Sequence, residues 1–100
     1  MSEERISRML AACKDPIRMQ ILFLLIRRGR TNVGDIAHEF KITRPAISHH
    51  LKVLSDAEVL NRAKEGQEVY YWPNSAVVAA TLRELADKIE TARRSQRKPQ

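Results

Sequence analysis

The chain has 100 residues, of which 18 are Lys or Arg and 12 are Asp or Glu, so its formal net charge is +6 at pH 7. A chain of this length forms one domain with a core of moderate size, and its positive charge favours a nucleic acid or another anionic partner. No stretch is long and apolar enough to span a membrane, and the N-terminus lacks the apolar centre of a signal peptide. The single cysteine excludes an intramolecular disulfide and, with the other features, indicates a cytoplasmic protein.

Two helices are expected within the first 28 residues. The first covers about residues 3–12 and has an apolar stripe. This stripe consists of Ile6, Met9, Leu10 and Cys13. Asp15 and Pro16 begin the second helix as N-cap and first helical residue, and Gly29 ends it. Because its segment ILFLLI is apolar all round, we expect neighbours to bury this helix on most sides.

The next segment predicts two helices joined by a short connection, which is a helix-turn-helix. Asn32 is suited to cap the first, short helix, and Thr43 to cap the second, which reads TRPAISHHLKVL from its cap. Ile47, Leu51 and Leu54 fall on one side of this second helix. Polar and basic residues occupy the other side or its flank, a composition that suits the major groove of DNA. They are Arg44, Pro45, Ser48, His49 and Lys52.

The rest of the chain predicts a β-hairpin and a last helix. Two β-like runs, residues 58–64 and 67–72, flank Glu65 and Gly66. The last helix runs from about residue 76 to 93 and has apolar residues spaced by fours and threes, which is typical of a helix that meets another helix. This seam consists of Val78, Leu82, Leu85, Ile89 and Ala92. The order of elements predicts a mostly α winged helix-turn-helix domain over residues 1–93, with the hairpin as wing, followed by a basic, disordered tail at 94–100.

Three segments resemble the ArsR/SmtB family of bacterial and archaeal repressors. They are KDPIRMQILFLL, VGDIAHEFKITRPAISHHLKVL and EGQEVYYW, and the resemblance covers roughly residues 10–72. It implies a homodimeric, sequence-specific DNA-binding transcriptional repressor whose partners are double-stranded operator DNA near its own promoter and a second copy of itself. Many family members release DNA when a metal or another signal arrives.

The resemblance also implies two sets of site residues. The DNA-binding set would be Arg44, Pro45, Ser48, His49 and Lys52 on the recognition helix, with Arg62, Lys64 and Gln67 on the wing. The dimer surface would join the first and last helices through Ile6, Met9, Leu10, Val78, Leu82, Leu85 and Ile89.

The chain departs from the family at the positions where other family members carry residues that bind a signal. Founding members carry a Cys-x-Cys pair at the positions of Asn32 and Gly34, and other members place Asp, His and Glu ligands on a last helix that here has Asp87 and Glu90 but no histidine. Redox members pair two cysteines, and this chain has one. We therefore expect no metal site and no cofactor. The effector is unknown: the protein could be controlled by its own abundance, which we favour, by a small molecule between subunits, or by oxidation of Cys13.

Glu58 is a further departure, because the family usually has Gly there, after the recognition helix. If the backbone at this position is left-handed, Glu costs about 1 kcal/mol relative to Gly.

Several single residues allow a second interpretation. His49 and His50 are unsuited to share one metal ion because adjacent side chains on a helix point about 100° apart, so we interpret His49 as a DNA contact and His50 as packing or next to a phosphate. Cys13 is interpreted as a small buried hydrophobe rather than a redox sensor.

The aromatic residues of the second hairpin strand, Tyr70, Tyr71 and Trp72, could stack on bases or fill the core under the wing. Strand alternation puts Tyr71 on one face and the other two on the opposite face. We favour core filling, because a small domain needs aromatic bulk.

The sequence favours a DNA-binding regulator over two other classes of protein. Winged-helix domains that bind other proteins often lack a positively charged face. The basic residues of this chain therefore argue against such a role, namely Arg44, Lys52, Arg62 and Lys64. An enzyme is not expected, since no Ser/His/Asp or Cys/His arrangement has support in the sequence.

Overall fold

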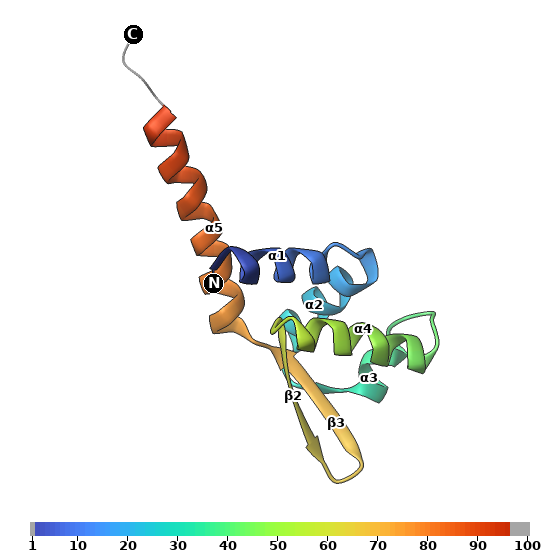
Figure 1. The fold of residues 1–100 in the computed structure, drawn as a ribbon. Helices are drawn as coiled ribbons and strands as arrows, with labels where there is room; N and C mark the ends of the chain where they lie inside the picture. The colour runs from blue at the N-terminus through green and yellow to red at the C-terminus, as the bar shows by residue number, and fades with distance from the viewer. Residues whose placement is uncertain (1, 97–100) are drawn as a thin grey trace.

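The computed structural model describes residues 2–96, in which a small antiparallel sheet adjoins a body of helices (Figure 1). The elements in chain order are α1 Ser2–Cys13, α2 Pro16–Arg28, β1 Thr31–Asn32, α3 Val33–His38, α4 Arg44–Asp56, β2 Leu60–Glu65, β3 Glu68–Pro73 and α5 Ser75–Gln96. This order confirms the predicted mostly helical winged helix-turn-helix. In Figure 1 the β2–β3 hairpin projects from one side of the helical body and the end of α5 projects from the other.

Three helices begin where short polar side chains cap them, as predicted. The Asp15 carboxylate accepts hydrogen bonds from the backbone N–H groups of Ile17 and Arg18 at the start of α2, at 2.9 and 3.1 Å. Asn32 and Thr43 accept in the same way at the starts of α3 and α4, at 2.8 and 3.3 Å. Each cap satisfies N–H groups that have no partner within the helix.

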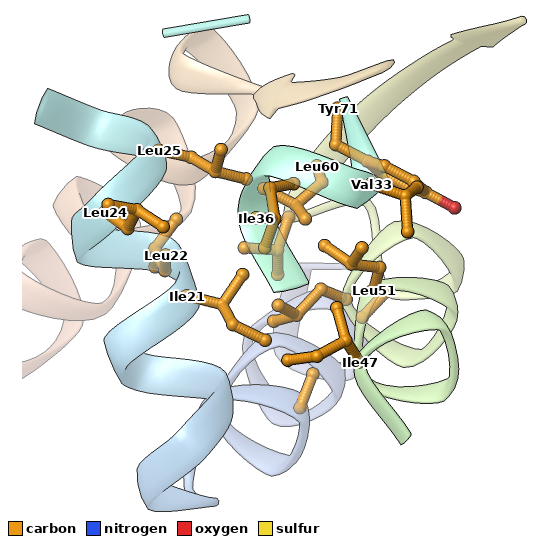
Figure 2. Packing of buried hydrophobic residues seen from close by; sticks show 14 of the residues in the cluster. Ile21, Leu22, Leu24, Leu25, Val33, Ile36, Ile47, Leu51, Leu60 and Tyr71 are labelled. Atoms are coloured by element: carbon orange, nitrogen blue, oxygen red, sulfur yellow. The ribbon is translucent and has the colours of Figure 1, made fainter. Parts of the chain in front are cut away.

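The core lies between α2, α3 and α4 and extends to the sheet (Figure 2). Ile21 and Leu25 of α2 meet Ile36 of α3, and all three are fully buried. Ile47, Leu51 and Leu54 of α4 are fully buried as well, so one face of this helix points inward. Replacing one such leucine by alanine costs about 2–5 kcal/mol. Burial of this face leaves the opposite face of α4 outside.

The sheet has a third strand that the sequence patterns did not predict. Its order is β1-β3-β2, and β1 pairs antiparallel with β3 through Thr31 opposite Tyr71 and Asn32 opposite Tyr70. A strand of two residues is too short to show alternation, which is why it escaped prediction. It attaches the base of the hairpin to the connection between α2 and α3.

The hairpin itself is confirmed, with boundaries shifted by one or two residues. β2 and β3 are joined by the two-residue loop Gly66–Gln67, and Gly66 has a φ of 61°. Glycine tolerates a positive φ at the first loop position, which is the requirement of a type II′ turn.

Two helices differ in extent or burial from the predictions. α5 continues to Gln96, so residues 94–96, expected in the tail, are helical; 97–100 lie outside the described residues. Glu90, which pairs with Arg93 at 2.7 Å, supports this last part of the helix.

The prediction that α2 is covered on most sides was wrong, because Phe23 and Ile26 are more than half exposed. Among the helices of residues 2–96, none has the length and apolar character to cross a membrane.

Candidate nucleic-acid interface

The outer face of α4 carries the residues that the sequence assigned to the recognition helix. Arg44, Pro45, Ser48, His49 and Lys52 are all exposed. They lie outside because the opposite, apolar face of α4 is locked into the core. The three expected wing residues, Arg62, Lys64 and Gln67, are exposed too.

The recognition helix and the wing meet in one hollow of about 390 Å³. It is lined by Ser48, Lys52, Ser55, Asp56, Arg62 and Tyr71. The Arg62 guanidinium lies over the Tyr71 ring, 5.9 Å from its centroid. The structure therefore brings Ser48 and Lys52 together with Arg62, whereas Gln67 lies in the turn at the tip of the wing and Lys64 lies two residues before this turn.

The charges around this hollow are only partly neutralised within the protein. Lys52 Nζ lies 3.0 Å from Asp56 Oδ2, but the two side chains are 72% and 67% exposed. Such surface pairs contribute about 0–1 kcal/mol, so Lys52 is readily available to another anion. Within residues 2–96, Arg44, Arg62 and Lys64 have no ion-pair partner. The surface is thus positive where α4 and the wing adjoin.

Arg44 lies across the start of α3. One of its terminal guanidinium nitrogens is 3.7 Å from the point that a Cβ on Gly34 would occupy. The side chain is exposed and long, and it belongs to the first turn of α4, where it is free to turn toward a ligand that approaches this end of the helix.

The end of α4 is fixed by a Schellman motif. The Glu58 N–H donates to the Ser55 carbonyl at 3.0 Å, and the Val59 N–H donates to the Leu54 carbonyl at 2.9 Å. Glu58 has a φ of 65°, so the left-handed backbone considered from the sequence is present. The motif occupies residues 58 and 59, which is why β2 begins at Leu60 rather than at 58.

Arg30, on the connection between α2 and β1, holds the outer face of the wing and was not anticipated. Its guanidinium lies 4.0 Å from the centroid of the Tyr70 ring and 5.7 Å from that of Trp72, and it also forms an ion pair with Glu65. Tyr71 points to the opposite face and is buried, so core filling is confirmed for Tyr71. Tyr70 and Trp72 are half-buried and stack with Arg30 instead. No local pattern relates Arg30 to residues 40 positions away.

The residues expected at a dimer surface fall into two groups. Ile6 and Met9 of α1 are buried within the chain itself, where α1 packs against α2, α4 and α5, so they have little area left for a second subunit. Leu10, Leu82 and Ile89 are exposed by 46%, 48% and 58%, and Val78 and Leu85 are half-buried. A periodic pattern identifies an apolar face but does not say which part of it the same chain covers.

Cys13 is half-buried at the end of α1. Burial raises the pKa of its thiol, and the nearby Arg18 guanidinium lowers it to a smaller extent. The net shift reduces the thiolate fraction at neutral pH, which is unfavourable for reaction with oxidants. In the part of the chain that the structure describes, no three His, Cys, Asp or Glu side chains converge on a point where they could hold a metal ion.

Comparison with known sequences places this geometry in a family. The profile described as "Bacterial regulatory protein, arsR family" matches residues 15–62, from the cap of α2 into the wing. The "Transcriptional repressor SdpR" of Bacillus subtilis (strain 168) is 44% identical over 71 residues, which are 71% of this chain and 78% of that protein. The chain belongs to the arsR family of bacterial regulatory proteins. The predicted family is thereby confirmed, and it is a class of regulators rather than of enzymes.

Solved structures of the arsR family share the fold. An "ArsR-like Transcriptional Regulator from Rhodococcus sp. RHA1" superposes with a TM-score of 0.79 at 28% identity, covering 92% of this chain and 87% of that one. A domain from Mycobacterium bovis, described as a homodimeric winged helix-turn-helix DNA-binding domain, superposes with a TM-score of 0.70 at 25% identity. That match covers 85% of this chain and 81% of the other.

Proposed function

We propose that this arsR-family protein is a cytoplasmic, homodimeric repressor of transcription that binds double-stranded operator DNA in a sequence-specific manner. The observation that carries the proposal is the outer face of α4, where Ser48 and Lys52 adjoin Arg62 of the wing in one positive hollow. A surface helix enters the major groove when its outer side chains can donate and accept hydrogen bonds at base edges. The dimer would present two recognition helices to successive major grooves about 34–36 Å apart, so the operator should be an imperfect palindrome.

The two parts of the surface would have different tasks. Arg44 stands at the start of the recognition helix, and an arginine fork pairs with two acceptors on guanine. Lys64 stands near the tip of the wing, where a flexible ammonium is suited to a phosphate. Base contacts carry sequence information and phosphate contacts carry general affinity.

The test compares Arg44→Ala and Lys64→Ala on a duplex selected by the wild-type protein from a random library and on a scrambled duplex. Arg44→Ala should weaken binding to the selected duplex by about 1–3 kcal/mol and to the scrambled one far less. Lys64→Ala should weaken both and reduce the slope of log affinity against log salt by about 1. Arg83→Ala removes the same charge from an exposed position of α5 as a control. Equal losses on both duplexes for Arg44→Ala would contradict the assignment.

We further propose that DNA release does not depend on a transition metal at either of the family's best-known sites. Zinc-like ions prefer thiolates and imidazoles. Asn32 uses its side-chain oxygen to cap α3, Gly34 has no side chain, and Glu90 is paired with Arg93 on α5. These observations support independence of such a metal, and we favour control by the abundance of the protein itself because it requires no residue that the chain lacks.

Isothermal titration of the tag-free dimer with zinc tests metal independence. We expect no binding heat and unchanged affinity for the selected duplex. Stoichiometric, submicromolar zinc binding that also weakens DNA binding would overturn this part of the proposal.

A further inference from the structure

One side chain connects three helices at the base of the recognition helix. Arg18, in the first turn of α2, donates from Nε to the Ala12 carbonyl oxygen in the last turn of α1, at 2.6 Å. A terminal nitrogen of the same guanidinium lies 3.2 Å from Nδ1 of His50 on α4. Both Arg18 and His50 are half-buried. The contact spans 32 residues of sequence, so it depends entirely on how the helices pack.

The chemistry of this contact determines the state of His50. A guanidinium has N–H donors and no acceptor, so Nδ1 of His50 must accept the hydrogen bond. This hydrogen bond requires the tautomer of His50 that carries its proton on Nε2. The Asp15 carboxylate also faces this corner: it accepts a hydrogen bond from the Arg18 backbone N–H at 3.1 Å, and this bond together with the charge of Arg18 favours its ionised form.

The position of His50 gives the contact a consequence for α4. The residues on either side of His50 point in opposite directions: Leu51 is fully buried in the core, and His49 is exposed on the outer face. Apolar packing is non-directional, whereas a hydrogen bond has strict distance and angle requirements. A directional bond on the flank of α4 therefore restrains rotation of the helix about its own axis. The apolar residues alone would restrain this rotation less strongly.

We propose that Arg18 and His50 form a latch that sets the orientation of α4 against α1 and α2, and that His50 is a positioning residue for sequence recognition. This inference rests on the proposed function, because orientation matters when side chains must match base edges. His50 then acts through the placement of Arg44, Ser48 and His49, without touching DNA itself.

The first test uses variants that keep or remove the acceptor at Nδ1. His50→Asn keeps a side-chain oxygen near that place, His50→Phe keeps a ring without an acceptor, and Arg18→Met removes the donor. His38→Phe makes the matched exchange on α3, where the histidine is exposed. Affinities are measured for the selected and scrambled duplexes at one salt concentration and at a temperature where thermal unfolding curves show every variant to be folded.

Loss of the latch should lower sequence discrimination. His50→Phe and Arg18→Met should each reduce the ratio of the two affinities about five- to tenfold, as expected for one hydrogen bond. The double variant should lose no more than Arg18→Met alone, because Arg18→Met already removes the bond that His50→Phe removes, besides the bond to the Ala12 carbonyl. His50→Asn should recover most of the ratio, and the salt slope should not change. Equal loss on both duplexes, additive losses, or an unchanged ratio with only a lower Tm would overturn the positioning role.

The second test needs no DNA. ¹⁵N NMR of the imidazoles should show His50 as the Nε2–H tautomer in the wild-type dimer at neutral pH, and Arg18→Met should abolish that preference. If His50 of the wild-type protein shows no such tautomer preference, the latch is overturned while the proposed function stands. If the wild-type protein selects no duplex at all, the proposed function fails and the positioning role fails with it, while the NMR result still reports on the contact.

Discussion

At the scale of single residues, short polar side chains decide where the helices of this regulator begin. Asp15, Asn32 and Thr43 each accept a backbone hydrogen bond at a helix start, and all three were predicted as caps from sequence. The prediction succeeds because a cap and the N–H groups it binds are only two or three residues apart. Capping needs no knowledge of the rest of the fold.

Asp15 should make stability dependent on pH in the acidic range. The hydrogen bond from the Arg18 backbone N–H is the largest of the influences that hold the pKa of Asp15 below its ordinary value of 3.8. Because the folded pKa lies below the unfolded one, the stabilising contribution is present above the unfolded pKa and is lost as pH falls through the folded pKa. Glu39 behaves in the same direction, through its hydrogen bond from Arg28.

Urea unfolding followed from neutral pH into the acid range measures this effect. The free energy of unfolding of the wild type should fall as the pH drops below about 4. Asp15→Asn keeps a capping oxygen but cannot ionise, so its curve should be flatter over that interval. The same pH dependence in both proteins would show that Asp15 does not contribute.

At the scale of elements, the junctions between helices and strands set the geometry of the candidate DNA surface. The Schellman motif ends α4 and directs the chain into β2, and the short strand β1 with Arg30 holds the other side of the wing. The wing is thus attached at its base to α4 through one strand and to the connection after α2 through another. Its residue Arg62 reaches the hollow beside α4 for this reason.

Glu58→Gly should stabilise this junction. The left-handed φ of 65° at Glu58 is strained for a residue with a Cβ, so glycine should raise the free energy of unfolding by about 1 kcal/mol. The ion pair between Arg5 and Glu58 spans 3.8 Å with both side chains about half exposed, and its loss should cost little.

Glu58→Ala is the matched control for this substitution, since it removes the ion pair but keeps the Cβ. Urea unfolding at neutral pH compares the three proteins. If Gly and Ala at this position give equal stabilities, the backbone strain is not the cause.

At the scale of the whole molecule, part of the apolar seam of α5 stays uncovered within residues 2–96. Over 22 residues this helix is about 33 Å long and its far end extends away from the body (Figure 1). Leu82 and Ile89 are about half exposed, and Leu10 of α1 is exposed as well. A second copy is the partner that we propose for these residues.

Leu85→Asp should therefore give monomers with little affinity for the selected duplex. A charge at the centre of the seam would be buried without a partner in the dimer, which is strongly unfavourable. Thr91→Asp adds the same charge to the exposed, opposite side of α5 and should leave the dimer intact. Light scattering reports the mass, and a dimeric Leu85→Asp variant would place the interface elsewhere.

Patterns along the chain predict the order of the helices and the hairpin, the three capped helix starts, the outward face of α4 and the family. These features depend on periodicity and on contacts between residues close along the chain. Ile6 and Met9 are covered by their own chain while Phe23 and Ile26 are not, and this difference follows from which helices pack together in three dimensions. The contacts of Arg30 with Tyr70 and of Arg18 with His50 likewise join segments 40 and 32 residues apart. No local pattern encodes such pairs, since each exists only where packing of the core has already brought the two segments together.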